Sequence, residues 1–194
     1  FVVSATNDMD ETGTKRIGSP ADSINSMVVG AIDFSGKPAP YHRLGPVLSY
    51  LTKPDASTFG GVSDNRISVF SPDGIRKVEG TSFAAPWIAR KLAYLIHILG
   101  MSRETAKALL IDAAAGWHEN FRLRNAVGYG AVPQKIDDII RTPNDEIKFF
   151  IRGRIEDYAT YAMNIPVPQT NGKFPFLAKA TLCYFPKCSR AQGV

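Results

Sequence analysis

Residues 80–99, GTSFAAPWIARKLAYLIHIL, contain the clearest helical pattern of the chain. Apolar side chains recur there at the spacing of one face of a helix. They are Ile88, Leu92, Leu95, Ile96 and Leu99. Gly100 follows the last of them, and glycine is a residue at which helices commonly end. The pattern therefore predicts a helix over residues 82–99.

Ser82 lies at the start of this predicted helix. Its hydroxyl is expected beside backbone N–H groups that lack a partner within the helix, where developing negative charge is stabilised. Gly80 allows a tight turn and the close approach of a substrate backbone, and Pro86 removes one N–H from the first turns. A serine before an apolar helix is most often only an N-cap. The helix pattern alone leaves both interpretations open, an exposed nucleophile and a cap.

The segments on either side of this helix indicate an α/β fold. Residues 1–3 and 27–33 are continuous apolar runs, which are typical of parallel strands that are covered on both faces. A second helix is expected directly after Ser102, because Ser102 is a good N-cap and apolar residues follow it at helical spacing. Alternation of strands and helices favours a parallel sheet.

Residues 34–78 are rich in glycine and proline, so we expect mainly loops there. Only two short strands are predicted within this stretch, near residues 47–51 and 67–70. After the second helix, further glycine and proline residues interrupt the chain, and a short helix is predicted over residues 134–141.

In the last quarter of the chain, apolar and polar residues alternate, as they do in a strand with one covered face. The alternation runs over residues 147–151, 161–167 and 174–184. It predicts a small antiparallel β segment, too small to be stable without packing on the rest of the chain. We therefore divide the chain into an α/β part, residues 1–142, and a small antiparallel β domain, residues 143–194.

The composition is that of a globular protein, with 44% hydrophobic and 21% charged residues. The chain has 23 Lys and Arg against 18 Asp and Glu, a formal net charge of +5. The basic residues are scattered, without a cluster or interleaved aromatic residues, so nucleic-acid binding is not expected. No run approaches the roughly 18 consecutive apolar residues of a membrane span, so no membrane contact is expected.

The two cysteines, Cys183 and Cys188, have no histidine or third cysteine nearby, so they are not expected to bind zinc. Their spacing allows either one disulfide or two reduced thiols. We favour reduced thiols and, with them, a cytoplasmic protein. Both ends of the sequence look like cuts in a longer chain, so any targeting signal would lie upstream and the localisation itself stays unknown.

The heptapeptide of residues 80–86, G-T-S-x-A-x-P, resembles the serine motif of the subtilisin-like serine peptidases, the subtilases. Residues 2–7, VVSATN, are similar to the turn in which this family places an asparagine that donates to the oxyanion. The resemblance extends over roughly residues 1–140. It implies part of a doubly wound, mostly parallel sheet with helices, and a polypeptide substrate.

The resemblance also implies the roles of three residues. Ser82 would be the nucleophile, and its backbone N–H with the side-chain amide of Asn7 would form the oxyanion hole. Thr81 would support these groups without touching the substrate. In this family the aspartate and the histidine of the triad precede the asparagine. They would then lie upstream of this sequence, and the chain alone is expected to be inactive.

By the same resemblance, Ser4, Ala5 and Thr6 lie along the pocket for the residue that precedes the scissile bond. Thr6 stands where the family usually has a glycine, a departure that we expect to narrow or reshape this pocket. The sequence therefore does not predict which residue the pocket prefers. Because upstream strands of the sheet would be missing, the chain alone is also expected to self-associate.

No other histidine is expected to act as the base. His97 lies about 22 Å along the predicted helix from the serine, too far for a hydrogen bond. His42 and His118 lack a paired acidic residue and are expected to be surface residues. Asp8 and Asp10 are expected to be loop carboxylates rather than calcium ligands. No metal and no cofactor is expected.

Taken together, the motifs around Asn7 and Ser82 favour the interpretation that this chain is the C-terminal part of a serine endopeptidase. A non-catalytic subtilase relative that acts as a protein-interaction module is the alternative, and it predicts that an upstream triad residue is replaced. A third hypothesis is an anion-binding domain that holds a phosphate at the start of the Ser82 helix, but it leaves Asn7 and Pro86 unexplained. The upstream sequence would distinguish the first two.

Overall fold

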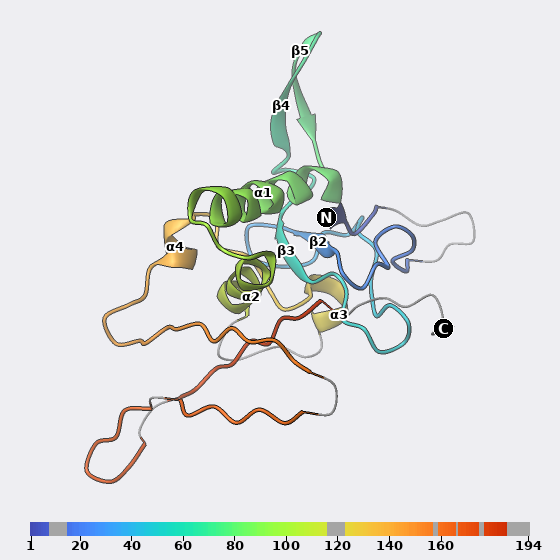
Figure 1. Ribbon diagram of the computed structural model, residues 1–194. Coiled ribbons are helices and arrows are strands. Elements are labelled where there is room, and N and C mark those ends of the chain that lie inside the picture. Colours follow the sequence, from blue (N-terminus) through green and yellow to red (C-terminus); the bar gives the residue numbers. More distant parts are fainter. Residues whose placement is uncertain (8–14, 116–122, 157–158, 166, 175–176, 186–194) are drawn as a thin grey trace. The chain divides into compact units, whose positions relative to one another are not determined.

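The computed structural model describes residues 1–7, 15–115, 123–156, 159–165, 167–174 and 177–185 (Figure 1). The chain divides into two compact units. One consists of Phe1–Arg141 with Thr181–Val194, and the other of Thr142–Ala180. Every residue that the sequence assigns to the site belongs to the first unit.

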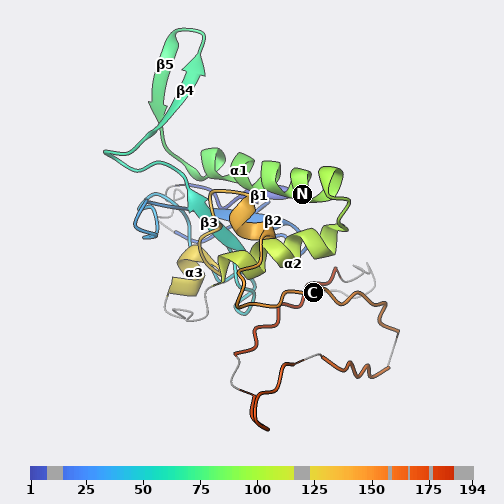
Figure 2. The same cartoon turned by 90° about the vertical axis from the view of Figure 1, so that its left-hand side faces the viewer.

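The first unit contains a parallel sheet of three strands, in the order β1-β2-β3 (Figures 1 and 2). The strands are β1 (Val2–Ser4), β2 (Met27–Ile32) and β3 (Ala56–Phe59). β2 pairs in parallel with both neighbours, and all of its residues are buried, as its continuous apolar sequence requires. The predicted α/β fold class with a parallel sheet is confirmed. β3 was not predicted, because its short sequence ASTF has no clear pattern.

Different elements cover the two faces of the sheet. Side chains alternate between the faces of a strand, so Met27, Val29 and Ala31 point to one face and Val28 to the other. The cluster that includes the first three contains Ala84, Ile88, Leu92, Leu95, Ala106, Leu109 and Leu110 from the helices. The cluster around Val28 contains Ala5, Ile17, Ala21 and Val47. Helices therefore cover one face, and loops cover the other.

The helix predicted over residues 82–99 is present as α1 (Thr81–Ala93), which continues into a π-helical turn, η1 (Tyr94–Ile98). α1 lies against β1 and β2. Its buried residues include Ile88 and Leu92, which belong to the predicted apolar face. The helical spacing of the apolar residues thus predicted both the helix and the side that it buries.

The second predicted helix is α2 (Arg103–Ala114), and Ser102 is its N-cap, with a side chain that accepts a hydrogen bond of 3.2 Å from a backbone N–H of the first turn. Two short helices follow, α3 (Arg124–Val127) and α4 (Asp137–Ile140). α4 lies within the helix predicted over residues 134–141. Among the helices of the described residues, none is both long enough and apolar enough to cross a bilayer.

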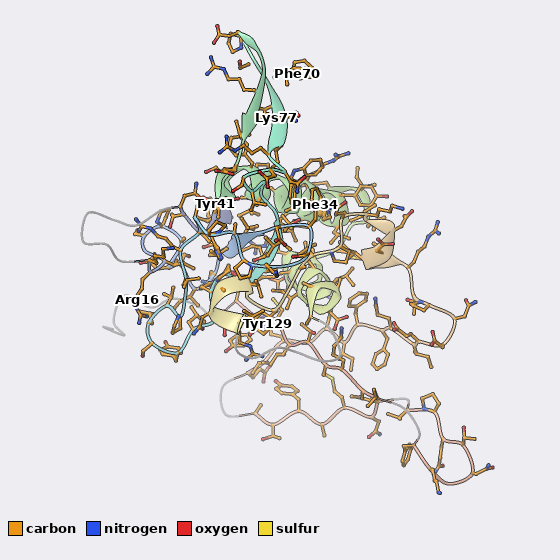
Figure 3. The ribbon with its side chains drawn as sticks, turned by 180° about the vertical axis from the view of Figure 1, so that it is seen from behind. Arg16, Phe34, Tyr41, Phe70, Lys77 and Tyr129 are labelled. Atoms are coloured by element: carbon orange, nitrogen blue, oxygen red, sulfur yellow. The ribbon has the colours of Figure 1, made fainter. Side chains whose placement is uncertain are left out.

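An antiparallel hairpin precedes α1. It consists of β4 (Ile67–Ser71) and β5 (Gly74–Val78), with Phe70 opposite Ile75. The hairpin stands clear of the sheet, and the Phe70 side chain near its tip is 90% exposed (Figure 3). β4 confirms the strand predicted near residues 67–70, whereas β5 was not predicted. The antiparallel pairing of this fold is therefore found before the serine motif.

The other strand predictions are wrong for the residues that the structure describes. Near residues 47–51 only an isolated bridge joins Val47 and Leu51. In the last quarter of the chain, the described residues form no strand, only a bridge between Thr170 and Lys173. An alternating sequence makes a strand only where a neighbouring strand supplies hydrogen bonds and another element covers the apolar face. That residues 143–194 form a domain of their own stays a prediction.

A buried group of charges lies at the amino end of β3. Lys53 is 1% exposed, and its Nζ lies 2.7 Å from Asp55 Oδ2 and 2.9 Å from the Ser26 carbonyl oxygen. Lys107 Nζ lies 3.2 Å from Asp55 Oδ1, and the N–H of Val28 donates to Asp55 Oδ2. Burial lowers the pKa of the Lys53 ammonium from its ordinary value. The Asp55 carboxylate therefore forms ion pairs with the ammonium groups of Lys53 and Lys107. It also accepts a hydrogen bond from the backbone of the central strand, β2.

We expect Asp55→Ala to lower the free energy of unfolding by about 3 kcal/mol, because it leaves the buried Lys53 ammonium without its carboxylate. Denaturant unfolding of the 194-residue chain measures this. Asp137→Ala is the matched control, because Asp137 forms only a 3.9 Å exposed ion pair with Arg141. The control is expected to change stability by about 0.5 kcal/mol or less. Equal effects of the two substitutions would contradict a stabilising role for the buried group.

Candidate active site

The predicted site residues gather at the edge of the sheet where the carboxyl ends of the parallel strands lie. Asn7 closely follows β1. Gly60 directly follows β3, and its carbonyl oxygen accepts a 2.9 Å hydrogen bond from the N–H of Gly80, the residue before α1. The start of α1 is thereby held at the same edge as Asn7. Ligands of open α/β sheets bind outside this edge.

Ser82 is the second residue of α1, and it is exposed. The N-cap position belongs to Gly80, with φ 147°, and a Cβ on Gly80 would lie only 3.0 Å from Asn7 Nδ2. The backbone conformation thus favours glycine at this position, and a larger residue would also crowd the Asn7 carboxamide. The interpretation of Ser82 as a simple N-cap is therefore wrong. Its hydroxyl lies in the first helical turn, where backbone N–H groups lack intrahelical partners.

The carboxamide of Asn7 is oriented by Thr81. Asn7 Oδ1 accepts a 2.9 Å hydrogen bond from the backbone N–H of Thr81 and a 2.8 Å hydrogen bond from its hydroxyl. Thr81 is fully buried, so this pair of donors is fixed. Because both donors are at the oxygen, the Nδ2 side of the carboxamide faces away from them. The amide N–H groups of Asn7 are then available to donate to another acceptor.

The three residues before Asn7 differ in how they are placed. Ser4 ends β1, and Ala5 is fully buried in the cluster on the loop-covered face. Thr6 has φ 67°, in the left-handed region that favours glycine, and its hydroxyl donates to the Ala5 carbonyl oxygen at 2.6 Å. Because Ala5 is fully buried, its side chain faces the core. A β-branched residue in this conformation is strained, at a cost of about 1–3 kcal/mol.

No hydrogen bond joins Ser82 to either histidine of the described residues. His97 is exposed at the far end of the helix. His42 was expected at the surface, but this is wrong: it is 2% exposed, and neither ring nitrogen has a hydrogen-bond partner. Burial, with a smaller contribution from Lys15, lowers the pKa of His42 to about 4. The predictions for His118, Asp8 and Asp10 lie outside the described residues.

The buried His42 predicts a loss of stability in acid. Its pKa is about 4 in the folded chain and about 6.5 when unfolded, so only the unfolded state takes up a proton between these values. Stability is therefore complete above pH 6.5 and falls progressively by about 3 kcal/mol as the pH is lowered to 4. Denaturant unfolding at a series of pH values measures this fall. His42→Phe should remove that part of the slope, whereas the exposed control His97→Gln should keep it; an unchanged slope in His42→Phe would contradict the assignment.

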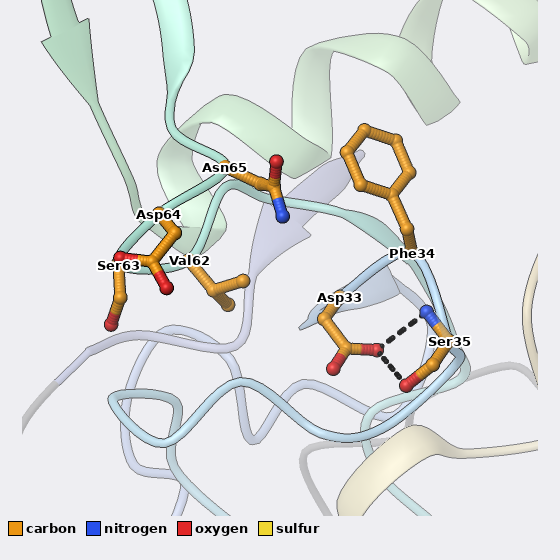
Figure 4. A pocket seen from close by; sticks show the side chains of 7 residues that line it. All are labelled: Asp33, Phe34, Ser35, Val62, Ser63, Asp64 and Asn65. Atoms are coloured by element: carbon orange, nitrogen blue, oxygen red, sulfur yellow. Dashed lines mark hydrogen bonds between the residues drawn. The ribbon is translucent and has the colours of Figure 1, made fainter.

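The structure also has an open pocket of about 360 Å³ that the sequence did not predict (Figure 4). Its lining residues are Asp33, Phe34, Ser35, Val62, Ser63, Asp64 and Asn65. Asp33 accepts hydrogen bonds from the Ser35 hydroxyl and from the N–H groups of Ser35 and Lys37, and these lower the pKa of its carboxyl. The pocket includes none of the predicted site residues. Its lining comes from the segments after β2 and β3, which are separate in sequence.

Two further predictions concern metals and thiols. Within the described part of the chain, no three His, Cys, Asp or Glu side chains come together as metal ligands. Cys183 is a partly buried free thiol, and burial raises its pKa. Cys188 lies outside the described residues. The predicted reduced state of both cysteines therefore stays a prediction.

With the fold and the geometry of Asn7, Thr81 and Ser82 described, comparison with known proteins defines the class. The family model described as "Subtilase family" matches residues 1–130. The chain therefore belongs to the subtilase family. This is a family of serine proteases, so hydrolysis of peptide bonds is its activity at the family level.

Three relatives illustrate the similarity. Subtilisin-like protease 2 of Pseudogymnoascus destructans is 32% identical over 107 residues, which are 55% of this chain and 24% of that protein. The structure of the prenylagaramide maturation protease PagA has 23% identity and a TM-score of 0.53, over 70% of this chain and 48% of that one. The epidermin leader peptide processing serine protease EpiP of Staphylococcus aureus has 18% identity and a TM-score of 0.56, over 76% and 42%. The chain thus spans about a quarter of the curated relative and less than half of each structure, and the structures support the fold alone.

Proposed function

We propose that this chain is part of a serine endopeptidase in which Ser82 is the nucleophile. In the intact protein, Ser82 Oγ would attack the scissile carbonyl carbon while a histidine from upstream takes its proton. An upstream aspartate would orient that histidine. The tetrahedral intermediate would then collapse as the histidine returns the proton to the leaving amine.

The orientation of Asn7 is the observation that supports this proposal most. A carboxamide whose oxygen already accepts two hydrogen bonds from Thr81 presents its N–H groups as donors. An oxyanion hole needs donors that are fixed before the reaction begins. Asn7 and the backbone N–H of Ser82 would together supply them, and Thr81 would hold Asn7 in place.

The strained backbone at Thr6 bears on the substrate pocket. We propose that Ser4, Ala5 and Thr6 border the pocket for the residue before the scissile bond. Ala5 would contribute through its backbone, because its side chain is buried. Thr6 would add a side chain where family members usually have none, and so would limit the size of the substrate residue that fits.

A fluorophosphonate probe tests the proposed nucleophile in the intact protein. We expect one probe per active site, attached to Ser82, together with cleavage of unfolded polypeptides. Ser82→Ala should abolish both, whereas Ser63→Ala, which removes the hydroxyl of an exposed serine in the segment before β4, should leave both unchanged. An intact protein that folds but neither reacts nor cleaves would support the alternative, a non-catalytic relative that acts as a protein-interaction module.

A further inference from the structure

The hydroxyl of Tyr41 bonds to the segment that directly follows β3. It lies 2.9 Å from the Gly60 carbonyl oxygen and 2.6 Å from the Gly61 carbonyl oxygen, within hydrogen-bond distance of both. The same Gly60 oxygen accepts the N–H of Gly80. A Cβ on Gly60 would come within 2.8 Å of the Tyr41 oxygen, so only glycine leaves room for this arrangement. Tyr41 and Gly80 are thereby joined through one carbonyl group.

The residues that follow Tyr41 contact the asparagine loop. The N–H of Arg43 donates to the Thr6 carbonyl oxygen at 3.3 Å, and His42 forms an antiparallel bridge with Asn7. The ring of His42 is buried, which fixes this short segment in place. Residues 41–43 therefore contact the asparagine loop directly through their backbone. They are linked to the serine motif only indirectly, through the Tyr41 hydroxyl and the Gly60 carbonyl oxygen that also accepts the Gly80 N–H.

We propose that Tyr41 is a positioning residue, whose hydroxyl holds Gly60 and Gly61 against Gly80 and so sets the place of Ser82 relative to Asn7. The catalytic part of this inference rests on the proposed function. Tyr41 does not touch the reacting atoms: it acts through Gly60 and Gly80. Burial raises the pKa of Tyr41 to about 12, so its hydroxyl keeps the donated proton throughout the pH range of a protease assay.

Amide hydrogen exchange measured in the intact protein tests the geometry without any activity. Tyr41→Phe keeps the ring and removes only the oxygen. We expect exchange at Gly80 and Thr81 to become about tenfold faster, because a lost hydrogen bond lowers the free energy of local opening. Exchange at Val28, whose N–H donates to the buried Asp55, should stay unchanged and so exclude global destabilisation.

Tyr129→Phe is the matched control. Tyr129 is also partly buried, but its backbone N–H donates a hydrogen bond to the Asp55 carbonyl oxygen. It therefore lies at the amino ends of the strands, whereas Tyr41 lies at the carboxyl ends. We expect this variant to leave exchange at Gly80 and Thr81 unchanged. Unchanged exchange in Tyr41→Phe, or equal acceleration at Val28, would overturn the positioning role.

Kinetics of the intact protein test the consequence for catalysis. Tyr41→Phe should lower kcat about tenfold with little change in KM, because misplaced donors affect the transition state more than the bound substrate. In an Asn7→Ala background the same change should lower kcat less than about twofold, because the geometry it protects is already lost. Equal factors in the two backgrounds, or a change in KM alone, would overturn the inference. If the wild-type intact protein is inert, the proposed function fails, and the exchange result still decides the positioning.

Discussion

Replacing Asn7 by alanine in the intact protein is expected to lower kcat by about 10²–10³, the effect that loss of one such donor has in a member of this family. KM should change little, because the negative charge that the amide stabilises exists only in the transition state. Steady-state kinetics with a peptide substrate measure both constants. A rise in KM at constant kcat would instead assign Asn7 to substrate binding.

Asn7→Asp separates the two functions of this side chain. A carboxylate can still accept the hydrogen bonds from the Thr81 N–H and hydroxyl, which are 2.9 and 2.8 Å long in this structure, but it has no N–H to donate. We therefore expect Asn7→Asp to keep the thermal stability that Asn7→Ala loses, and to lose kcat at least as severely. Near-normal kcat in a stable Asn7→Asp protein would exclude Asn7 as the oxyanion donor.

The 194-residue chain on its own is expected to stay unlabelled by a fluorophosphonate under conditions that label the intact protein completely. A serine hydroxyl is almost entirely protonated at neutral pH and needs an adjacent base. Neither His42, which is buried without hydrogen-bond partners, nor His97 at the far end of the helix can supply one. Loss of the histidine lowers kcat by about 10⁶ in a member of this family. A nucleophile weakened to that extent is expected to show no labelling.

Mass spectrometry of the probe-treated chain measures this prediction. The control is the intact protein under the same conditions, with Ser82→Ala to identify the labelled residue. Stoichiometric labelling of the 194-residue chain at Ser82 would mean that the chain contains its own base, and it would contradict the expectation that the triad is incomplete here. His118, which lies outside the described residues, would then be the residue to substitute first.

The helices and the central strand could be predicted because their signals are local. The helical spacing from Ile88 to Leu99 and the cap at Ser102 act within a few residues of the chain, and the run at 27–33 is apolar enough to be buried wherever it pairs. β3 and β5 were missed because a short strand depends on its neighbour. β3 contains only four residues, and pairing with β2 rather than its own sequence makes it a strand.

The failure of the C-terminal strand predictions has the same physical origin. Alternation over residues 147–151, 161–167 and 174–184 is a correct description of the sequence. Most of these apolar side chains are nevertheless exposed in the described residues, as Ile147 at 67% and Leu182 at 81% illustrate. A strand with one apolar face is stable only when another surface covers that face. The sequence does not specify which surface does so.

The sequence by itself determined the parallel α/β core, the helix that begins at the serine motif, and the identity of Asn7, Thr81 and Ser82 as candidate site residues. The core and the helix are specified by neighbouring residues, and the candidate site residues by the resemblance of residues 2–7 and 80–86 to subtilase motifs. It also marked Thr6 as a departure from the family, but interpreted it only as a change in a pocket. The backbone conformation at Thr6, with φ 67°, became visible only in the structure.

Only the tertiary structure decided how the candidate residues act on one another. Asn7 and Thr81 are 74 positions apart, and the hydrogen bonds between them orient the amide. The burial of His42 and the contacts of Tyr41 with the two glycines likewise depend on segments that meet only after folding. The sequence states which chemical groups the side chains carry. Hydrogen bonds between residues far apart in the sequence form only when the sheet and its covering helix bring their atoms within about 3 Å of one another.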